Sequence, residues 1–232
     1  MTAPEPEFNT ELNPDTWVVI PLFNEAPVVG KVIADVKAAF TNVVCVDDAS
    51  SDDSAQVAAA AGAVVVQHAM NLGQGAALQT GITYALRHGA QYLVTFDADG
   101  QHRVKDAVAM VDLARREDLG FVFGSRFLGT RSDTGWLKRL VLRFAAWFTA
   151  KSTGLRVSDA HNGLRVLRAD AARAVRLRQD RMAHASEIVL QLARTNLPWK
   201  EHPVRVLYTD YSRRKGQSLW NSVNILIDLL FH

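Results

Sequence analysis

Short, continuous apolar runs alternate with helical segments along the first half of the chain, and this alternation constrains the fold more than any other feature. The apolar runs are residues 17–21, 43–46, 64–66 and 92–96. The segments between them with apolar residues at helical spacing are 26–40, 55–61 and 76–87. A continuous apolar strand is buried on both of its faces, which requires a mostly parallel sheet with helices on each side. We therefore expect an α/β fold, a three-layer sandwich around a Rossmann-like sheet.

Polar residues stand where three of these strands end, at 21–25, 47–48 and 97–99. Ligands of such sheets bind at the carboxyl ends of the strands. Asp97 and Asp99 place two carboxylates one residue apart, and such hard oxygen ligands suit a divalent cation that carries phosphate. A solvated loop after a strand is the alternative, and on the Asp-x-Asp spacing alone it is the commoner explanation.

The composition bounds the class of protein. With 232 residues, 48% of them hydrophobic, the chain can build one sizeable core. Lys and Arg number 26 against 24 for Asp and Glu, which argues against a protein that binds nucleic acid through bulk charge. The single cysteine, Cys45, excludes a disulfide within the chain, and residues 1–15 lack the basic and apolar regions of a signal peptide. We expect a cytoplasmic protein with a flexible tail at 1–16 and a single domain at 17–232.

Two stretches of the second half have the pattern of helices that lie on a membrane surface. No run of 18 apolar residues occurs, which excludes an ordinary transmembrane helix. The stretch 136–151 interleaves Lys and Arg with Trp, Leu and Phe, and the stretch 219–231 presents a large apolar face. Packing of both on the core is the alternative. Together they predict amphipathic interfacial helices and peripheral attachment to a membrane.

Several short motifs share one order and spacing. In the first half they are VIPLFNE at 19–25, VDDASSD at 46–52, NLGQG at 71–75 and FDADGQH at 96–102. In the second half they are GSR at 124–126, DAHNGLR at 159–165 and RRKGQS at 213–218. The set resembles family 2 glycosyltransferases over about residues 17–228, and most closely the polyprenyl-phosphate branch typified by dolichyl-phosphate mannose synthase. The resemblance implies a GT-A type fold, with a nucleotide-binding half at 17–125 and an acceptor and membrane-facing half at 126–232.

The resemblance also implies the functional residues. Those for the nucleotide sugar are Pro21, Asn24, Glu25, Asp48, Asp97, Ala98, Asp99, Arg213 and Lys215. Those for the acceptor phosphate are Arg126, Arg139 and Ser218, and those for a Mg²⁺ or Mn²⁺ ion are Asp97, Asp99 and Gln101. The catalytic set is Asp97, Asp99, Arg126 and Asp159. Asp99 is implied as the main metal ligand, and the division of roles between the two aspartates stays open. The basic residues near 213–218 are implied to form a lid over the diphosphate.

Other polar residues near these motifs receive structural interpretations. We expect a supporting role for His102, because hard cations prefer oxygen ligands. Asp52 is interpreted as a helix-capping and turn residue. Asp159 is expected to organise the site by orienting Arg165 or the sugar. The loop 71–75 lacks the spacing and the lysine of a P-loop, and we interpret it as packing beside the base.

The acceptor decides which groups the reaction needs. An alcohol acceptor requires a general base, whereas a lipid monophosphate is already anionic near neutral pH and attacks directly. Saccharide-acceptor members of the family typically carry a Glu-Asp pair after the metal motif, and none of the second-half motifs at 124–126, 159–165 and 213–218 contains such a pair. The acidic candidates of the second half are Asp133, Asp159 and Glu187. Glu187 resembles a family acidic position to which no role is assigned, and a solvated helix face is the alternative. Cations are abundant there: Arg126, Arg131, Lys138, Arg139, Arg143, Arg213, Arg214 and Lys215.

The function expected from this reasoning is inverting, metal-dependent transfer of a sugar from GDP-mannose or a UDP-hexose to polyprenyl phosphate. The expected partners are the nucleotide sugar, the lipid acceptor and the cytoplasmic face of a membrane, with no nucleic acid. A separate small membrane protein as an anchor is left open. The alternatives are a family 2 transferase acting on a saccharide or other alcohol, and a non-catalytic nucleotide-sugar-binding module.

Overall fold

The computed structural model describes residues 13–128, 155, 157–178 and 183–207. The expected interfacial stretches 136–151 and 219–231 lie outside the described residues, as do the expected site residues Arg139, Arg213, Lys215 and Ser218. None of the helices among the described residues combines the length and the apolar character needed to cross a membrane.

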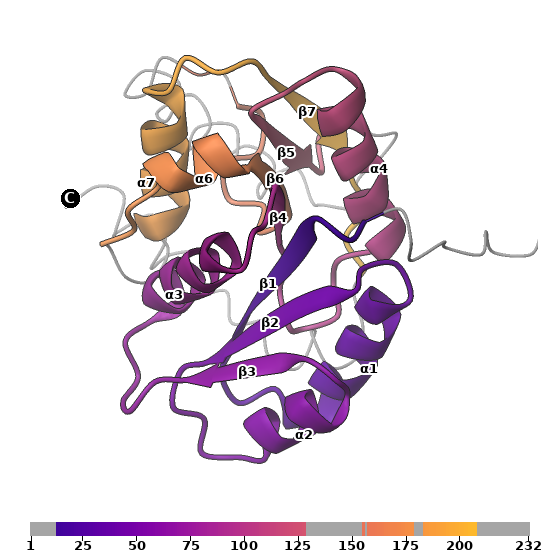
Figure 1. The fold of residues 1–232 in the computed structure, drawn as a ribbon, viewed down its shortest axis with the longest axis vertical. Helices are drawn as coiled ribbons and strands as arrows, with labels where there is room; N and C mark the ends of the chain where they lie inside the picture. Colours follow the sequence, from indigo (N-terminus) through magenta and orange to yellow (C-terminus); the bar gives the residue numbers. More distant parts are fainter. Residues whose placement is uncertain (1–12, 129–154, 156, 179–182, 208–232) are drawn as a thin grey trace, which may run out of the picture.

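Strands and helices alternate through the first half (Figure 1). The strands are β1 (Thr16–Leu22), β2 (Asn42–Asp47), β3 (Val64–Gln67), β4 (Tyr92–Thr95), β5 (Phe121–Ser125), β6 (Arg165–Arg168) and β7 (Trp199–Pro203). The helices are α1 (Ala26–Lys37), α2 (Ser54–Ala60), α3 (Gln74–Arg87), α4 (Val104–Arg116), α6 (Ala169–Ala174) and α7 (Ala183–Ala193). The four strands and three helices expected from the apolar pattern are all present within a few residues. Helix α1 ends at Lys37 rather than at residue 40, where Phe40 turns into the core with 1% exposure.

These strands form one seven-stranded sheet in the order β3-β2-β1-β4-β6-β5-β7. β1 pairs in parallel with β2 and β4, β2 with β3, and β5 with β7. β6 runs antiparallel to both of its neighbours, β4 and β5. The expectation of a mostly parallel sheet is confirmed, and β6 is its one departure among the described strands.

Helices cover both faces of the sheet, which gives the expected three layers (Figure 1). On one face α1, α2 and α4 pack on alternate strand residues such as Val18 and Ile20. On the other face α3, α6 and α7 pack on the residues between them, such as Val19. The approach of α3 is so close that a Cβ at Gly81 would lie 2.3 Å from Val19 Cγ1. Cys45 is fully buried in the first of these cores, as expected of a small core residue.

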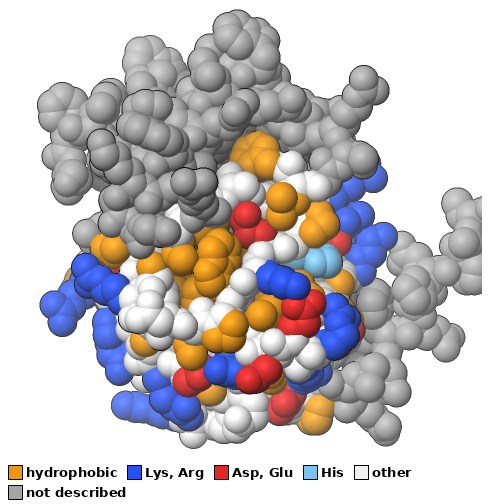
Figure 2. All heavy atoms as spheres, turned by 90° about the horizontal axis from the view of Figure 1, so that it is seen from above, with side chains coloured by type: hydrophobic (Ala, Val, Ile, Leu, Met, Phe, Trp, Pro, Cys, Tyr) orange, Lys and Arg blue, Asp and Glu red, His pale blue; other side chains and the backbone are white. Residues whose placement is uncertain are grey.

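Both halves of the chain contribute to this sheet. β6 lies between β4 and β5, and β7 extends the sheet beyond β5. Acidic, basic and apolar side chains are interspersed on the face shown in Figure 2, with Lys and Arg at several separate places. The described part of this face therefore has no single broad basic surface, and any cationic site on it consists of a few neighbouring Lys or Arg side chains.

Candidate active site

A cavity of about 520 Å³ opens at the carboxyl ends of β1, β2 and β4. Its lining residues are Pro21, Leu22, Phe23, Glu25, Asp48, Asn71, Gly73, Gln74, Ala77, Asp97, Ala98 and Asp99. They include six of the residues expected to bind a nucleotide sugar, namely Pro21, Glu25, Asp48, Asp97, Ala98 and Asp99. The structure thus brings together the ends of three strands that the sequence keeps far apart.

Asp97 leaves the end of β4 in a tightly built position. One carboxylate oxygen, Oδ2, accepts a hydrogen bond from His102 Nε2 at 2.9 Å, and Oδ1 lies 3.4 Å from Gln74 Nε2. The backbone of Gly163 packs directly against the same carboxylate, since a Cβ at that position would lie 2.2 Å from Oδ2. His102 is nearly buried, with a side chain 5% exposed, so it holds Asp97 in place, in agreement with the supporting role expected for it.

The two aspartates differ in their electrostatic surroundings. Burial opposes ionisation of Asp97, but the hydrogen bond and charge of His102 and the charge of Arg165 outweigh it and lower the pKa of Asp97. Burial and the neighbouring charge of Asp97 raise the pKa of Asp99 to about 6. The site therefore has one carboxylate that is firmly ionised and one that is repelled by it.

Asp159 and Arg126 form a partly buried ion pair at the end of β5. Arg126 Nε and Nη2 donate to Asp159 Oδ2 and Oδ1, both at 2.7 Å, and the backbone N–H of Arg126 donates to Oδ2 at 3.0 Å. The Asp159 side chain is only 1% exposed. Arg126, and not the expected Arg165, donates to both oxygens of Asp159. The residue that it orients is Arg126.

A second layer of polar contacts supports this pair. Glu201 of β7 accepts two hydrogen bonds from Ser158. The backbone N–H and the hydroxyl of Ser158 both donate to Glu201 Oε1 at 2.8 Å. The hydroxyls of Ser158 and Ser125 are 2.6 Å apart, and Ser125 Oγ accepts the N–H of Phe127. The chain on both sides of the Arg126 and Asp159 pair is thereby fixed.

The family profile of glycosyl transferase family 2 matches residues 17–176, more than half of the chain, and this range contains the cavity and the ion pair. The chain belongs to glycosyltransferase family 2.

Relatives of this glycosyltransferase are found at moderate identity. An uncharacterised protein of Methanocaldococcus jannaschii, MJ1222, is 33% identical over 95% of this chain and 93% of its own length. The UDP-N-acetylglucosamine–dolichyl-phosphate N-acetylglucosaminyltransferase of Methanococcus voltae is 25% identical over 92% of this chain and 94% of its own length. Both matches span nearly the whole of each protein.

Solved structures show the same fold. The glucosyl-3-phosphoglycerate synthase of Mycobacterium tuberculosis, in complex with Mn²⁺ and UDP-glucose, superimposes with a TM-score of 0.67. The match covers 95% of this chain and 79% of that one at 19% sequence identity. The glycosyltransferase therefore has the GT-A architecture expected from its motifs.

In this glycosyltransferase Asp48 is tied to the loop that follows β3. Its Oδ1 accepts the N–H of Leu72 at 2.9 Å, and its Oδ2 accepts the N–H of Gly73 at 2.7 Å. His68 Nδ1 lies 2.7 Å from Oδ1, and the other ring nitrogen lies 2.9 Å from Thr80 Oγ1. Asp48 therefore shapes the cavity wall as well as lining it. The reading of a nucleotide base or ribose by Asp48 stays a prediction.

The loops after β1 and β2 hold each other. Asn24 Oδ1 accepts the N–H of Ser51 at 2.8 Å, so Asn24 braces the loop after β2. Its binding of the nucleotide sugar stays a prediction. Asp52 Oδ2 accepts the N–H of Ala26, the first residue of α1. Asp52 Oδ1 also accepts the N–H of Ser54, the first residue of α2, at 3.0 Å. The interpretation of Asp52 as a capping residue is confirmed, and it serves the first turns of both α1 and α2. Glu25 N–H in turn donates to Ser54 Oγ at the start of α2, at 2.7 Å.

Arg165 is a buried cation between the two acidic groups of the site. It is 2% exposed, and its Nη2 donates to Ala160 O at 3.0 Å. Among the described residues its Nε has no hydrogen-bond partner. Burial lowers the pKa of Arg165 to about 10, while the charges of Asp97 and Asp159 act in the opposite direction. Arg165 thus links the aspartates of the cavity electrostatically to the ion pair.

The residues of the cavity fit a divalent cation. Among the residues that the structure describes, no three His, Cys, Asp or Glu side chains gather into a metal cluster. A Mg²⁺ ion bound by one or two carboxylates and by substrate phosphate oxygens needs no such cluster. The mutual repulsion of Asp97 and Asp99 is the charge arrangement that a cation relieves. The backbone N–H of Gln101 donates to Asp99 Oδ1 at 3.0 Å. That the side chain of Gln101 binds the metal ion stays a prediction.

Some residues of the site were not expected from the sequence. They are His68, Ser158, Gly163 and Glu201. His68 carries a signal that could have found it, because it directly follows β3 and thus stands at the same edge of the sheet as the aspartates. The other contacts depend on β6 and β7, whose places in the sheet no local pattern reveals.

Proposed function

We propose that this glycosyltransferase transfers a sugar from a nucleotide sugar to polyprenyl phosphate, with inversion and with the help of a divalent cation. The observation that carries the proposal is the ion pair of Arg126 and Asp159. Both oxygens of Asp159 are engaged by Arg126, so this carboxylate is unavailable as a general base. A fixed guanidinium instead suits an acceptor that arrives as an anion.

Glu187, another acidic candidate in the second half, is engaged elsewhere. Its carboxylate accepts the backbone N–H of Arg178, at 3.0 and 3.2 Å, and a hydrogen bond from Gln191. It is therefore a structural residue of α7 rather than an acid or base. This supports an acceptor that needs no deprotonation.

The donor would bind in the cavity at the ends of β1, β2 and β4. Asp97 and Asp99 would hold Mg²⁺ or Mn²⁺, which neutralises negative charge on the diphosphate leaving group. The Methanococcus voltae relative is named for a UDP-sugar donor and a dolichyl-phosphate acceptor, and the Mycobacterium tuberculosis structure for a complex with Mn²⁺ and UDP-glucose. A UDP-hexose or GDP-mannose is the donor class that we propose.

The remaining proposed groups follow in the chain beyond the described residues. Leu207, the last described residue, donates its N–H to Gln101 O at 2.8 Å, which places the end of the described chain beside the aspartate loop. Arg213 and Lys215 are proposed as the lid over the diphosphate. Arg139 and Ser218 are proposed for the acceptor phosphate.

The reaction would be a single displacement. An oxygen of the lipid phosphate attacks the anomeric carbon as the bond from that carbon to the nucleoside diphosphate breaks, which inverts the configuration. Asp159 fixes the guanidinium of Arg126 through two N–H groups, and we assign the acceptor phosphate to this fixed cation. The lipid acceptor implies peripheral attachment to the cytoplasmic face of a membrane, to which 136–151 and 219–231 would contribute.

The proposal is tested by incubating the purified enzyme with radiolabelled GDP-mannose, UDP-glucose or UDP-N-acetylglucosamine, with polyprenyl phosphate, and with or without EDTA. We expect a lipid-extractable labelled sugar that EDTA abolishes. Asp99→Asn serves as the variant deficient in metal binding, and Lys31→Gln, at an exposed pair with Asp35, as its control. Transfer only to a soluble saccharide would refute the lipid acceptor, and binding of donors without any transfer would support a non-catalytic module.

A further inference from the structure

A second hollow, of about 430 Å³, lies along α3 beyond the part of that helix that reaches the donor cavity. Its lining residues are Gln79, Thr83, Leu86, Arg87, Arg173, Arg176, Leu177 and Arg178, and we refer to it as the arginine groove. Gln74 and Ala77, at the start of the same helix, line the donor cavity. Gln79, Thr83, Leu86 and Arg87 follow further along the helix, and the two linings share no residue, so the groove is a separate place on the molecule.

The wall that carries three of these arginines is held in a defined conformation. Residues 175–178 follow α6 without regular structure. The three N–H groups of 176–178 donate in turn to Gln191 Oε1 at 2.5 Å, Gln79 Oε1 at 2.8 Å and Glu187 Oε2 at 3.0 Å. Side chains of α3 and α7 thus replace the hydrogen bonds that a helix or strand would supply, and this irregular segment stays fixed against both helices.

The described lining of the groove carries charges of one sign. Among the residues that the structure describes, it has four arginines and no acidic residue. Within the described part of the chain, the side chains of Arg87 and Arg173 are exposed and have no hydrogen-bond or ion-pair partner. Arg176 Nη1 donates to the backbone oxygens of Arg173 and Val175 at 2.9 and 2.8 Å, which fixes the direction of its guanidinium.

Four cations around one hollow repel one another and favour a bound anion. Guanidinium groups bind phosphate through paired hydrogen bonds, and the apolar floor of Leu86 and Leu177 accommodates the aliphatic parts of the arginines. We propose that the arginine groove binds a phosphate group, carried either by an anionic lipid at a membrane surface or by a soluble compound. This site is separate from the donor cavity, and the proposal does not depend on the sugar or acceptor assigned above.

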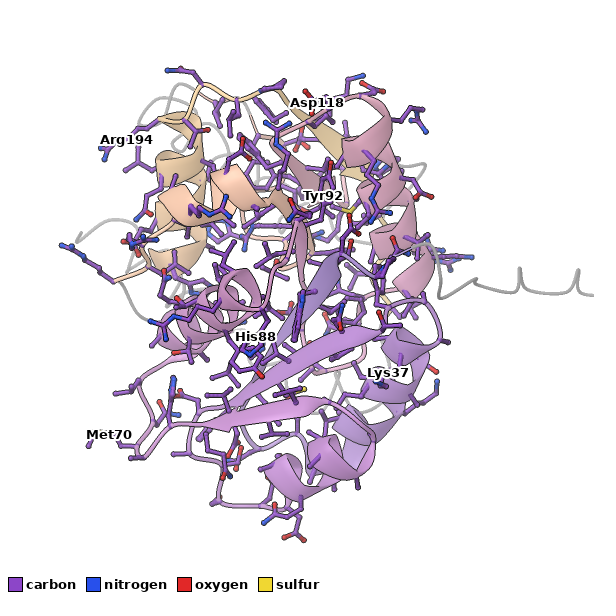
Figure 3. The ribbon with its side chains drawn as sticks, viewed as in Figure 1. Lys37, Met70, His88, Tyr92, Asp118 and Arg194 are labelled. Atoms are coloured by element: carbon purple, nitrogen blue, oxygen red, sulfur yellow. The ribbon has the colours of Figure 1, made fainter. Side chains whose placement is uncertain are left out.

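The test compares two double variants with equal loss of charge. Arg87→Gln with Arg173→Gln removes two groove cations without touching the hydrogen bonds of the wall. Arg116→Gln with Arg194→Gln is the matched control, because both residues are exposed and lie outside the groove; Arg194 stands near the end of α7 (Figure 3). One arm measures sedimentation with vesicles of phosphatidylcholine, with or without phosphatidylglycerol. The other arm measures binding of inorganic pyrophosphate by calorimetry.

We expect the groove variant to lose roughly 30-fold in affinity in at least one arm, and the control variant to lose much less. A loss confined to phosphatidylglycerol vesicles assigns the groove to a lipid headgroup, and a loss confined to pyrophosphate assigns it to a soluble phosphate. Pyrophosphate bound in the donor cavity would be unaffected by either variant. Equal behaviour of the two variants in both arms would overturn the proposal. Sugar transfer to a detergent-solubilised acceptor should be the same in the groove variant and in the control variant. A failure of the groove proposal is thereby distinguished from a failure of the proposed function.

Discussion

Substitution of Gly163 by alanine should disable the site through one added methyl group. The new Cβ would lie 2.2 Å from Asp97 Oδ2 and 2.7 Å from its Cγ. The backbone has little room to retreat, because the carbonyl of Gly163 accepts the hydroxyl of Thr95 at 2.6 Å and that of Leu164 accepts the N–H of Gly124 at 3.0 Å. Asp97 must therefore yield, and reaching ordinary contact distance requires a shift of about 1 Å. A displacement of that size at a reacting site costs about 100-fold in rate.

The control is Gly120→Ala. Gly120 directly precedes β5, at the end of that strand opposite the site, and its added Cβ would lie 2.5 Å from Leu197 Cβ. Both substitutions overpack the molecule and should cost about 1–3 kcal/mol in the free energy of unfolding, measured by urea denaturation. Only Gly163→Ala should lower kcat and weaken Mn²⁺ binding, measured below the unfolding transition by transfer assays and by calorimetry. If Gly163→Ala retained wild-type turnover and metal affinity, the placement of Asp97 in the reaction would be refuted.

Three further outcomes are expected. Asp159→Asn should raise the KM for the phosphate acceptor by about 10- to 100-fold and leave the donor KM unchanged, because it removes the group that orients Arg126; steady-state kinetics with each substrate varied would show this. Since the pKa of Asp99 is raised to about 6, protons compete with the cation below that pH, and calorimetry should show metal affinity falling, with proton release on binding, as the pH drops through 6. Burial raises the pKa of Cys45 to about 12, so iodoacetamide should label it only as fast as the protein unfolds, and rapid labelling of the folded protein would contradict the core assignment.

The parallel core and the donor edge could be predicted because they depend on local patterns. Runs such as 43–46 are apolar at every position, and that signal requires burial on both faces whatever the rest of the chain does. The aspartates at 97–99 follow such a run directly, so their place at the edge of the sheet was predictable as well.

The second half of the site was less predictable because its contacts are tertiary. The strand β6 reads Arg-Val-Leu-Arg, which is too short and too polar to indicate a central strand, yet Arg165 is buried there. The partner of Asp159 could not be chosen between Arg165 and a sugar because the true partner, Arg126, stands 33 positions earlier in the chain. The close packing of Gly163 on Asp97 has no signature in the sequence at all.

The position of β6 also determines the order in which the protein can become complete. During synthesis β4 and β5 emerge first, but each lacks its neighbour until the later strand inserts between them in the antiparallel direction. Until then both present unpaired strand edges, which are prone to association with other chains. The same insertion brings Gly163 against Asp97 and Asp159 against Arg126. A nascent chain therefore joins β4 to β5 and brings these two pairs of site residues together in a single step, and β7 completes the sheet beside β5 afterwards.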